Sequence, residues 1–434
     1  MPCSLKPWAF IIVAASLTGC ATYHPRPLPT APNPSATLPA ADHPLTLEKA
    51  VSLAVERSPN LLVERKKANV AQAQAYAAGL LPDPQFSASL DHPTVPGPGL
   101  VNGYALGLAQ DLQTLLTEPS RLEGSKAKQA QAKLDLLWAE WQTTQHTANL
   151  YAQKFFAARK VALLDRTAKI LSIQSEHSAR ALATHDTTID VAGSDLSASL
   201  DVTSQRDAAM RAAISADADL KTELNLPPEG SLELSDPGEP SVPSREQVKA
   251  ALDNVINKRP DLLALKAGYH AQEQSVRTAI LEQFPAINLG FNRASDTSNV
   301  HTTGLSVSLN IPIFGGTQAK IRGERATRAQ LYAEYQARLD QTNADAWRIW
   351  QSLNLLKSQV ERLGRDVPEL RKMAETGQKA YRVGNLAPAT YVLLETTLAT
   401  RESELLDLKT TLWADAIALR TLLAMSPLLP GLAR

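Results

Sequence analysis

Two long stretches of the chain carry a helical pattern of hydrophobic and polar positions. The later stretch, Gln318 to Ala424, is rich in Ala, Arg, Gln, Glu and Leu, which lose little side-chain freedom in a helix. Its first helix, Gln318 to Tyr381, would extend roughly 95 Å at about 1.5 Å per residue. A globular core cannot cover such a helix, so the pattern predicts packing against neighbouring helices, as in coiled coils.

The later stretch is interrupted once, at Tyr381-Arg382-Val383-Gly384-Asn385-Leu386-Ala387-Pro388. Gly384 suits the left-handed residue that ends a helix, and Pro388 suits the first turn of the next helix. The sequence therefore predicts two antiparallel helices joined by a tight turn. Pro368 lies inside the first helix and predicts a kink there.

The earlier stretch, 120–226, has a similar composition and no proline between its ends. A shift of 201 residues aligns five landmarks of the two halves: Pro59 with Pro260, Pro84 with Pro285, Phe86 with Ile287, Leu108 with Leu309, and Ala183 with Gly384. Chance similarity of Ala-rich helices is the alternative. We interpret the match as an internal duplication, with repeats at 45–243 and 244–434.

In each repeat the pattern changes to alternation with a period of two. The alternating apolar positions are Phe86, Ala88, Leu90, Tyr104, Leu106 and Leu108 in the first repeat, and Ile287, Leu289, Phe291, Leu305, Val307, Leu309 and Ile311 in the second. With polar loops at 91–102 and 293–303, each repeat predicts one β-hairpin. Strands of about ten residues can cross a bilayer at a tilt. A small soluble sheet with one wet face is the alternative, and periodicity leaves both open.

Aromatic residues mark two further features. Phe86, Tyr104, Phe291 and Phe314 lie near strand ends, where they suit either an interfacial belt or strand packing. Trp138 with Trp141, and Trp347 with Trp350, form two pairs spaced three residues apart on the helices. Such pairs favour packing in a helix seam, with contact to a partner protein as the alternative.

The N-terminus has the pattern of a bacterial lipoprotein signal. Residues 1–19 contain one charge, Lys6, and an apolar run from Trp8 to Ala15, too short for a membrane span. Leu17-Thr18-Gly19-Cys20 then resembles a lipobox, which predicts acylation of Cys20. Ala21 follows rather than Asp, which indicates sorting to the outer membrane. Residues 20–44 are proline-rich and predict an extended tether.

Composition excludes several classes of protein. The chain has 44 basic and 44 acidic side chains, so charge gives no case for nucleic acid. Cys3 lies in the predicted signal, which leaves only Cys20 and no internal disulfide. No later stretch has 18 uninterrupted apolar residues, so a membrane crossing would have to use strands.

Catalytic and metal-binding patterns are not found. The eight His residues include no pair three or four apart, so we expect no metal site and no cofactor. Gly315-Gly316-Thr317 lacks the further Gly and the Lys of a phosphate-binding loop and indicates a turn. No Gly-x-Ser-x-Gly elbow occurs. We therefore expect a protein that is not an enzyme.

The lipobox, the two-fold repeat and the motif Tyr381–Leu386 together resemble the TolC family of outer-membrane efflux channels, over essentially everything after Pro44. The resemblance implies a mainly α fold with membrane β-strands. Three chains would pool four strands each into one trimeric α/β barrel, continued by coiled-coil-like helical hairpins across the periplasm. It also implies a homotrimer that works with a periplasmic adaptor and an inner-membrane pump.

In that family the turn after the Tyr-x-x-Gly motif lies at the periplasmic end, where the tunnel closes. The resemblance places this helix tip at Ala183 in the first repeat and at Gly384 and Pro388 in the second. Some members carry an Asp pair just after the turn, but the matching positions are Thr390 and Leu393, a departure from the pattern. The nearest acidic residues, which are candidates for a constriction or for a solvated outer face, are Asp186, Asp190, Asp195 and Glu395. Asp186 or Asp190 is also a candidate cap for the helix after the first turn.

The predicted function is an outer-membrane channel subunit of a three-part efflux system, anchored by lipid and extending into the periplasm. It would conduct passively while the pump supplies the energy. The alternatives are a periplasmic adaptor, expected to have one helical hairpin in a β domain, and a structural coiled-coil envelope lipoprotein. The sequence does not indicate whether the substrate is a heavy metal, a drug or another small molecule, because specificity would reside in the pump.

Overall fold

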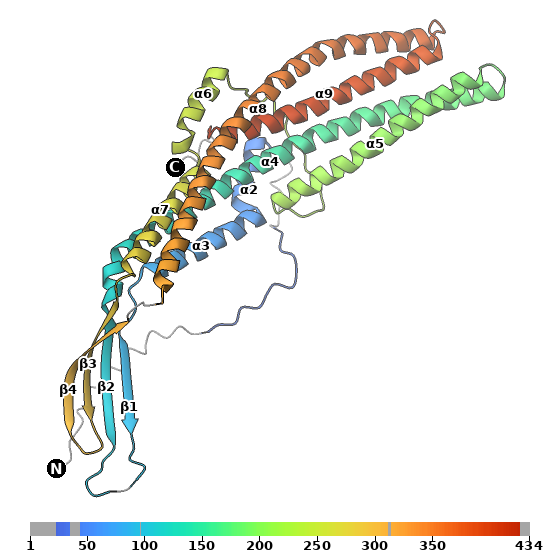
Figure 1. Ribbon diagram of the computed structural model, residues 1–434. Coiled ribbons are helices and arrows are strands. Elements are labelled where there is room, and N and C mark those ends of the chain that lie inside the picture. Colours follow the sequence, from blue (N-terminus) through green and yellow to red (C-terminus); the bar gives the residue numbers. More distant parts are fainter. Residues whose placement is uncertain (1–22, 35–43, 96, 311–313, 426–434) are drawn as a thin grey trace. The chain divides into compact units, whose positions relative to one another are not determined.

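The computed structural model describes residues 23–34, 44–95, 97–310 and 314–425 (Figure 1). The chain divides into two units, Met1–Ser35 and Ala36–Arg434. In the first unit, residues 23–34 are exposed and irregular, with a bend at Thr30 and Ala31. The predicted signal, Cys20, Ile311 and residues 21, 22 and 35–43 of the predicted tether lie outside the described residues.

The second unit passes twice through one order of elements. The first repeat contains α2 (Leu47–Arg57), α3 (Pro59–Gly79), β1 (Gln85–Asp91), β2 (Gly103–Asp111), α4 (Leu112–Ala183) and α5 (Ile189–Glu223). The second contains α6 (Arg245–Asn254), the short 3₁₀ helix η2 (Val255–Asn257), α7 (Pro260–Leu281), β3 (Ala286–Ser295), β4 (His301–Asn310), α8 (Gly316–Arg382) and α9 (Pro388–Leu422). This order agrees with a duplication, while the exact repeat boundaries stay a prediction.

Proline marks the same helix start in both repeats. Ser58 ends α2 and caps α3, its Oγ accepting a hydrogen bond from the Leu61 amide at 3.4 Å, and Pro59 occupies the first turn. Pro260 occupies the corresponding position of α7. Proline suits this position because its missing N–H would have no helical acceptor there.

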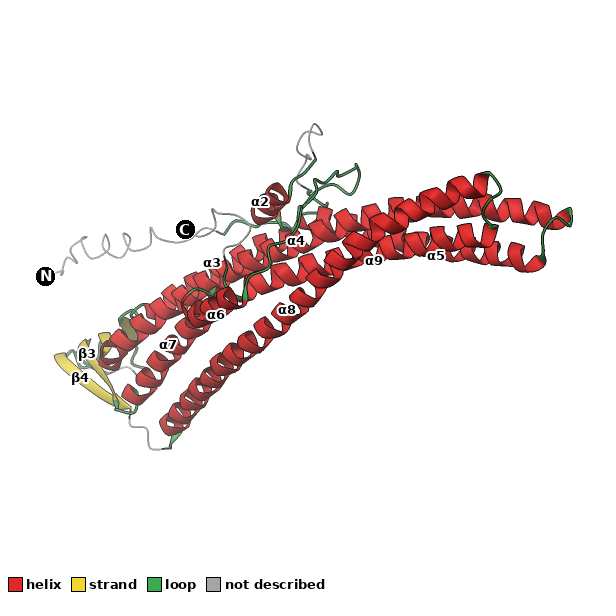
Figure 2. Ribbon diagram, turned by 90° about the horizontal axis from the view of Figure 1, so that it is seen from above, coloured by secondary structure: helices red, strands yellow, loops and turns green. Residues whose placement is uncertain are grey.

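The long helices pack side by side rather than around one core. Helix α3 lies against α4, α4 against α7, and α7 against α8, while α5 and α9 both pack on α4 (Figures 1 and 2). Helix α9 also pairs with α8. Their buried side chains include many Ala, Ser and Thr, which allow close approach of helices. The predicted coiled-coil-like hairpins are therefore α4–α5 and α8–α9.

The largest hydrophobic clusters lie where the short helices and the linker, residues 224–244, cover the long helices. One cluster joins α2 to α4 and the end of α5 through Leu53, Tyr151 and Leu220. Another joins α6 to α8 and α9 through Val248, Leu353 and Leu419. Trp347 and Trp350 contribute to this second cluster, and the Trp350 indole donates to the Pro243 carbonyl at 3.0 Å. Packing of this tryptophan pair is thus confirmed.

Tyr151 connects the start of the first repeat, at Leu45, with the linker, at Ser235. Its Oη lies 2.6 Å from the Leu45 carbonyl oxygen and 2.7 Å from that of Ser235. The two segments also pair directly, since the Leu45 amide donates to Glu233 at 2.8 Å and the Ser235 amide donates to Leu45 at 3.0 Å. Burial raises the pKa of Tyr151 to about 12, so its hydroxyl stays protonated and available as a donor.

One expectation about element lengths needs adjustment. The predicted loop 293–303 is shorter, because Arg293–Ser295 pair with β2 and β4 and His301–Thr303 belong to β4. Helix α8 continues through Pro368, as predicted, and the kink at that residue stays a prediction.

Within the described ranges, none of the helices has an apolar run long enough to cross a membrane.

Candidate functional site

The four strands form one antiparallel sheet in the order β1-β2-β3-β4. Phe86 lies opposite Leu108, Leu108 opposite Phe291, and Phe291 opposite Leu305, so large apolar residues form rows across the sheet. Within the described strands, β1 and β4 each pair on one side only. Their outer backbone groups are therefore available for further strand pairing.

The two faces of the sheet differ in chemistry. One face carries large apolar side chains that are exposed: Phe86, Leu90, Leu106, Leu108, Ile287, Leu289, Phe291, Leu305, Val307 and Leu309. The other carries mainly Ser, Gly, Ala, Asn and Thr, with Gln85, Asp91 and Asp111 at strand ends. A Cβ at Gly107 would lie 2.6 Å from Ser87 Oγ, and one at Gly290 would lie 2.5 Å from Ser306 Oγ. The second face thus requires small residues, and the first presents an apolar surface for lipid or another chain.

The two hairpin turns share one backbone geometry. The Asp186 amide donates to Ala181 at 2.8 Å, and the Asn385 amide donates to Ala380 at 2.8 Å, as expected for a helix end closed by a left-handed residue. That residue is Gly384 in the second repeat, with φ of 78°. In the first repeat it is His185, with φ of 62°, and Ala183 is still helical. The alignment of Ala183 with Gly384 was therefore wrong by two residues, because α4 continues further before its turn.

The helices after the turns begin differently. Pro388 occupies the first turn of α9, as predicted. Helix α5 begins after Thr188, and no side chain caps it. The predicted cap is therefore wrong: Asp190 lies in the first turn, and the Asp186 carboxylate accepts from Thr184 Oγ at 2.6 Å.

The six candidate constriction residues fall into two groups in the single chain. Asp186, Asp190, Thr390 and Leu393 are exposed near the turns. Asp195 and Glu395 are 1% and 8% exposed and lie among the helices. Placement of any of the six at a constriction stays a prediction.

A polar network joins the two hairpins below their turns. The Gln174 amide donates to Asp195 Oδ2 at 2.9 Å, the Ser178 hydroxyl donates to the same oxygen, and Tyr381 Oη donates to Gln174 Oε1 at 2.6 Å. Tyr381 stacks on Tyr391, with ring centres 4.7 Å apart. The network therefore ties α4 and α5 of the first hairpin to α8 and α9 of the second.

Glu395 occupies the α9 side of this region. Burial raises the pKa of its carboxyl, opposed by the charge of Arg166 on α4 and by a hydrogen bond from Tyr391, while Glu402 raises it further. The carboxylate oxygens of Asp195 have unequal hydrogen bonding: Oδ2 has two donors, whereas Oδ1 is buried without a hydrogen-bond partner among the described residues.

The sequence and the fold were compared with known proteins. The family described as outer membrane efflux protein matches residues 251–425. This match covers most of the predicted second repeat. No curated protein sequence matches the chain. The resemblance drawn from the lipobox, the repeat and the turn motif is confirmed by the family match and by the fold, and with it the predicted outer-membrane efflux channel subunit.

Solved structures share the fold over nearly the whole chain. CusC, described in connection with transmembrane channel formation, is 16% identical with a TM-score of 0.71 over 93% of this chain and 99% of that one. The CmeC outer membrane channel of Campylobacter jejuni is 14% identical with a TM-score of 0.72, over 87% and 85%. The MtrE outer membrane channel of Neisseria gonorrhoeae, in its open state, is 16% identical with a TM-score of 0.68, over 93% and 97%. At these identities the likeness establishes the fold, and the predicted fold class of helical hairpins and β-hairpins is confirmed.

Reasoning from the sequence missed Gln174, Ser178 and Tyr391 as members of the network between the two hairpins. Tyr381 was part of the recognised motif, but its contact with Gln174 spans 207 residues. Gln174 and Ser178 are single polar residues in a long helix, and nothing local distinguishes them from a solvated face. Their burial, 4% and 5% exposed, appears only once the helices are placed in register.

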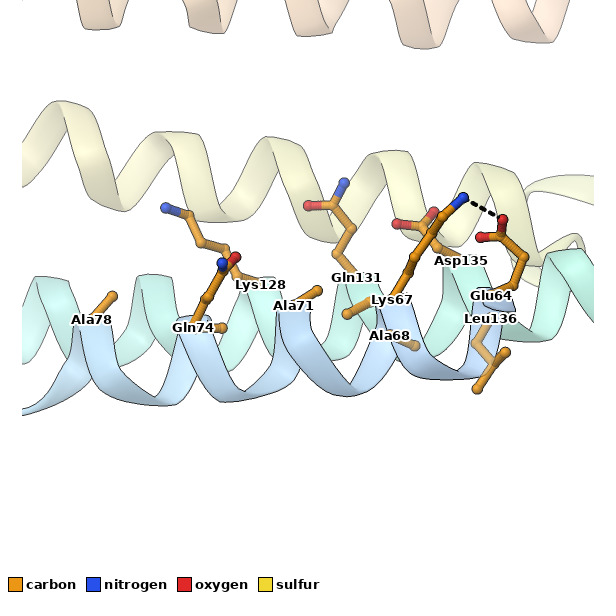
Figure 3. Close-up of a pocket in the computed structure, with 12 residues that line it drawn as sticks. Glu64, Lys67, Ala68, Ala71, Gln74, Ala78, Lys128, Gln131, Asp135 and Leu136 are labelled. Carbon is orange, nitrogen blue, oxygen red and sulfur yellow. Dashed lines mark hydrogen bonds and ion pairs between the residues drawn. The ribbon is translucent and has the colours of Figure 1, made fainter. Parts of the chain in front are cut away.

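A hollow of about 520 Å³ lies between α3 and α4 (Figure 3). Its floor is made by alanines, of which Ala68, Ala75 and Ala132 are buried. Figure 3 shows Lys67, Lys128 and Gln131 on the same side of the helix pair. Lys67 pairs with Glu64 at 2.6 Å, whereas Lys128 has no ion-pair partner in the described part of the chain. This chemistry suits a wall in contact with water.

In the described part of the chain, no group of three His, Cys, Asp or Glu side chains is placed to hold a metal ion. The expectations of no metal, no cofactor and no catalysis stay predictions.

Proposed function

We propose that three copies of this chain form one outer-membrane channel that passively conducts the cargo of an inner-membrane pump, handed on by a periplasmic adaptor. Cys20, acylated, would anchor each copy in the outer membrane. The described region would extend from that membrane into the periplasm.

The observation that carries the proposal is the incomplete sheet. Each backbone N–H or C=O left unpaired in hydrocarbon costs several kcal/mol, so four strands with two free edges are not stable alone in a bilayer. Pairing β1 of one copy with β4 of the next removes both edges in a closed ring. The exposed apolar rows then face lipid, and the small polar residues face the interior.

The flanking helices support the same arrangement. Helix α5 leaves Ile189, Leu196, Leu200, Met210 and Ile214 exposed, at spacings near those of a coiled-coil seam. Helix α8 leaves Leu355 and Met373 exposed. Because α5 and α8 lie on opposite sides of the α4–α9 pair, a head-to-tail ring brings these apolar surfaces together.

The inter-hairpin network is the element we propose to control opening. In one arrangement Tyr381 and Gln174 hold the two hairpins together near their turns. Separation of the hairpins breaks this bond, whereas the stack of Tyr381 on Tyr391 lies within the second hairpin and stays intact. An adaptor that binds the separated arrangement better would therefore shift the population toward an open channel.

The test is the oligomeric mass and membrane location of the full-length, lipidated protein extracted in mild detergent. We expect a trimer from the outer membrane that forms ion-conducting pores in planar bilayers. Cys20→Ser separates anchoring from assembly, since it should abolish acyl labelling while trimers still form. A monomer, or a protein confined to the inner membrane, contradicts the channel and favours the adaptor alternative.

A further inference from the structure

A second cavity, of about 270 Å³, lies beneath the linker, which we call the linker cavity. Its walls come from four parts of the chain: Phe156 of α4, Val242 of the linker, Val360 of α8, and Leu406 and Trp413 of α9. Phe156 and Trp413 belong to one hydrophobic cluster, while Val242 and Val360 border another. The cavity is thus a gap between two hydrophobic clusters, with apolar side chains on its inner walls and charged side chains around them. The apolar walls lack contacts that close packing would supply.

The linker is held over this cavity at two points. The Trp413 indole N–H donates to the Gly238 carbonyl at 3.1 Å. Arg159 pairs with Asp236 at 3.2 Å. These two contacts hold the linker across the gap instead of within it.

The charges around the cavity are not equivalent. Arg159 and Lys357 are more than half exposed and have acidic partners, Asp236 and Glu361. Glu239 is exposed on the linker. Lys409 is half-buried and has no hydrogen-bond or ion-pair partner among the described residues.

Lys409 also stands within the apolar wall. Leu406 lies one helical turn before it, and Leu412 and Trp413 lie one turn after it, so all four share one side of α9. A half-buried ammonium group beside apolar side chains interacts most favourably with an anion that also carries an apolar chain. The chain covers the apolar wall, and the ion pair is partly desolvated and therefore stronger than an exposed one.

We propose that the linker cavity binds a small amphiphile with a carboxylate head and a single apolar chain. The chain fills the gap beside Phe156, Val360 and Trp413, and the carboxylate pairs with Lys409. A volume slightly below that of usual drug-sized sites fits one chain or one ring rather than a two-chain lipid. Because the linker joins the two repeats, the bound molecule braces their junction.

The experiment measures quenching of tryptophan fluorescence by 10-bromodecanoate in the full-length protein reconstituted in phosphatidylcholine vesicles. We expect a saturable component that is lost in Trp413→Phe, because bromine quenches only a ring in contact with it. Lys409→Gln should weaken binding of 10-bromodecanoate at least tenfold and leave binding of 10-bromodecanol unchanged. Lys379→Gln, at an exposed lysine of α8, is the matched control and should change neither.

Val360→Phe fills the cavity and should remove saturable quenching by both compounds, while circular dichroism and pore formation confirm that the variant folds. Quenching that rises without saturation, or that persists in Trp413→Phe, reports partition into the bilayer and overturns the proposal. Equal affinity for the acid and the alcohol in the wild type overturns the assignment of Lys409. Neither outcome affects pore formation, so the channel proposal is judged separately.

Discussion

The two hairpins form the same type of turn with different residues at the left-handed position, and each buries a different acidic residue near its turn. Both turns close with the same backbone hydrogen bonds, yet one uses His185 and the other Gly384 at the left-handed position. Below them, Asp195 accepts hydrogen bonds from buried side chains, whereas Glu395 lies where burial disfavours its charge. The turn geometry is thus a requirement of the fold that several residues can meet, while the buried polar groups are particular to each hairpin.

The largest expected effect comes from removing the acid of the first hairpin. Asp195→Ala leaves the Gln174 amide and the Ser178 hydroxyl buried without their acceptor, at a cost of about 2–3 kcal/mol. We expect faster hydrogen exchange in the first turns of α5 and in α4 near Gln174. The matched change in the second hairpin, Glu395→Gln, should cost far less because it removes a disfavoured charge. Equal losses of stability in the two variants would contradict the difference between the two buried acids.

Substitutions at the two left-handed positions should change stability in opposite directions. Gly384→Ala places a Cβ at φ of 78°, where no atom lies within 4 Å, so the cost is backbone strain of about 1 kcal/mol. His185→Gly relieves strain in the other turn and should stabilise it by about 0.5 kcal/mol. Exchange protection of the residues flanking each turn reports both effects. Loss of protection in both variants would mean that the His185 side chain itself holds its turn.

Acidity should act on the second hairpin through Glu395. Its pKa in the folded chain is raised above the ordinary 4.5, so the folded state binds the proton more tightly than the unfolded state. The hairpin therefore gains stability as the pH falls through the raised pKa toward 4.5, and loses that gain at higher pH. Glu395→Gln should flatten this dependence in hydrogen-exchange measurements taken over that range. A slope that survives the substitution must belong to another group.

The smallest expected effect concerns the first turn of α5. Asp190 places a negative charge near the positive end of the helix dipole, worth about 0.3–1 kcal/mol at low salt. Asp190→Asn should reduce protection of the first α5 amides by that amount, and the difference should shrink as salt is added. The corresponding residue of the second hairpin, Ala389, carries no charge, so Ala389→Asp should give the opposite change in α9.

Local patterns predicted most of the fold. Alternation at Phe86–Leu90 and Ile287–Phe291 located the strands, and proline and glycine at Pro59, Pro260 and Gly384 located helix ends. The patterns underestimated β3 because Arg293 and Ser295 are polar and are held in the strand by β2 and β4 on its two sides. Tertiary pairing decides such residues, and a single sequence contains no record of it.

The candidate site was less accessible to this reasoning. Asp195 and Glu395 were found as acids near a turn, but nothing local showed that both are buried. The turn in the first repeat was misplaced because Ala183 lies opposite Gly384 in the alignment, whereas His185 adopts the left-handed conformation. Gln174 meets Asp195 and Tyr381 only when three helices from both repeats are in register.

The hydroxyl of Tyr151 has a mechanical consequence. It joins the segment that leads from the N-terminal tail, at Leu45, to the linker that leads into the second repeat, at Ser235. A pull on the tail is therefore shared between both repeats instead of unzipping α2 from its end. With a pKa of about 12, the Tyr151 hydroxyl stays protonated in acid and in mild alkali, so its hydrogen bonds do not depend on the pH of the surroundings.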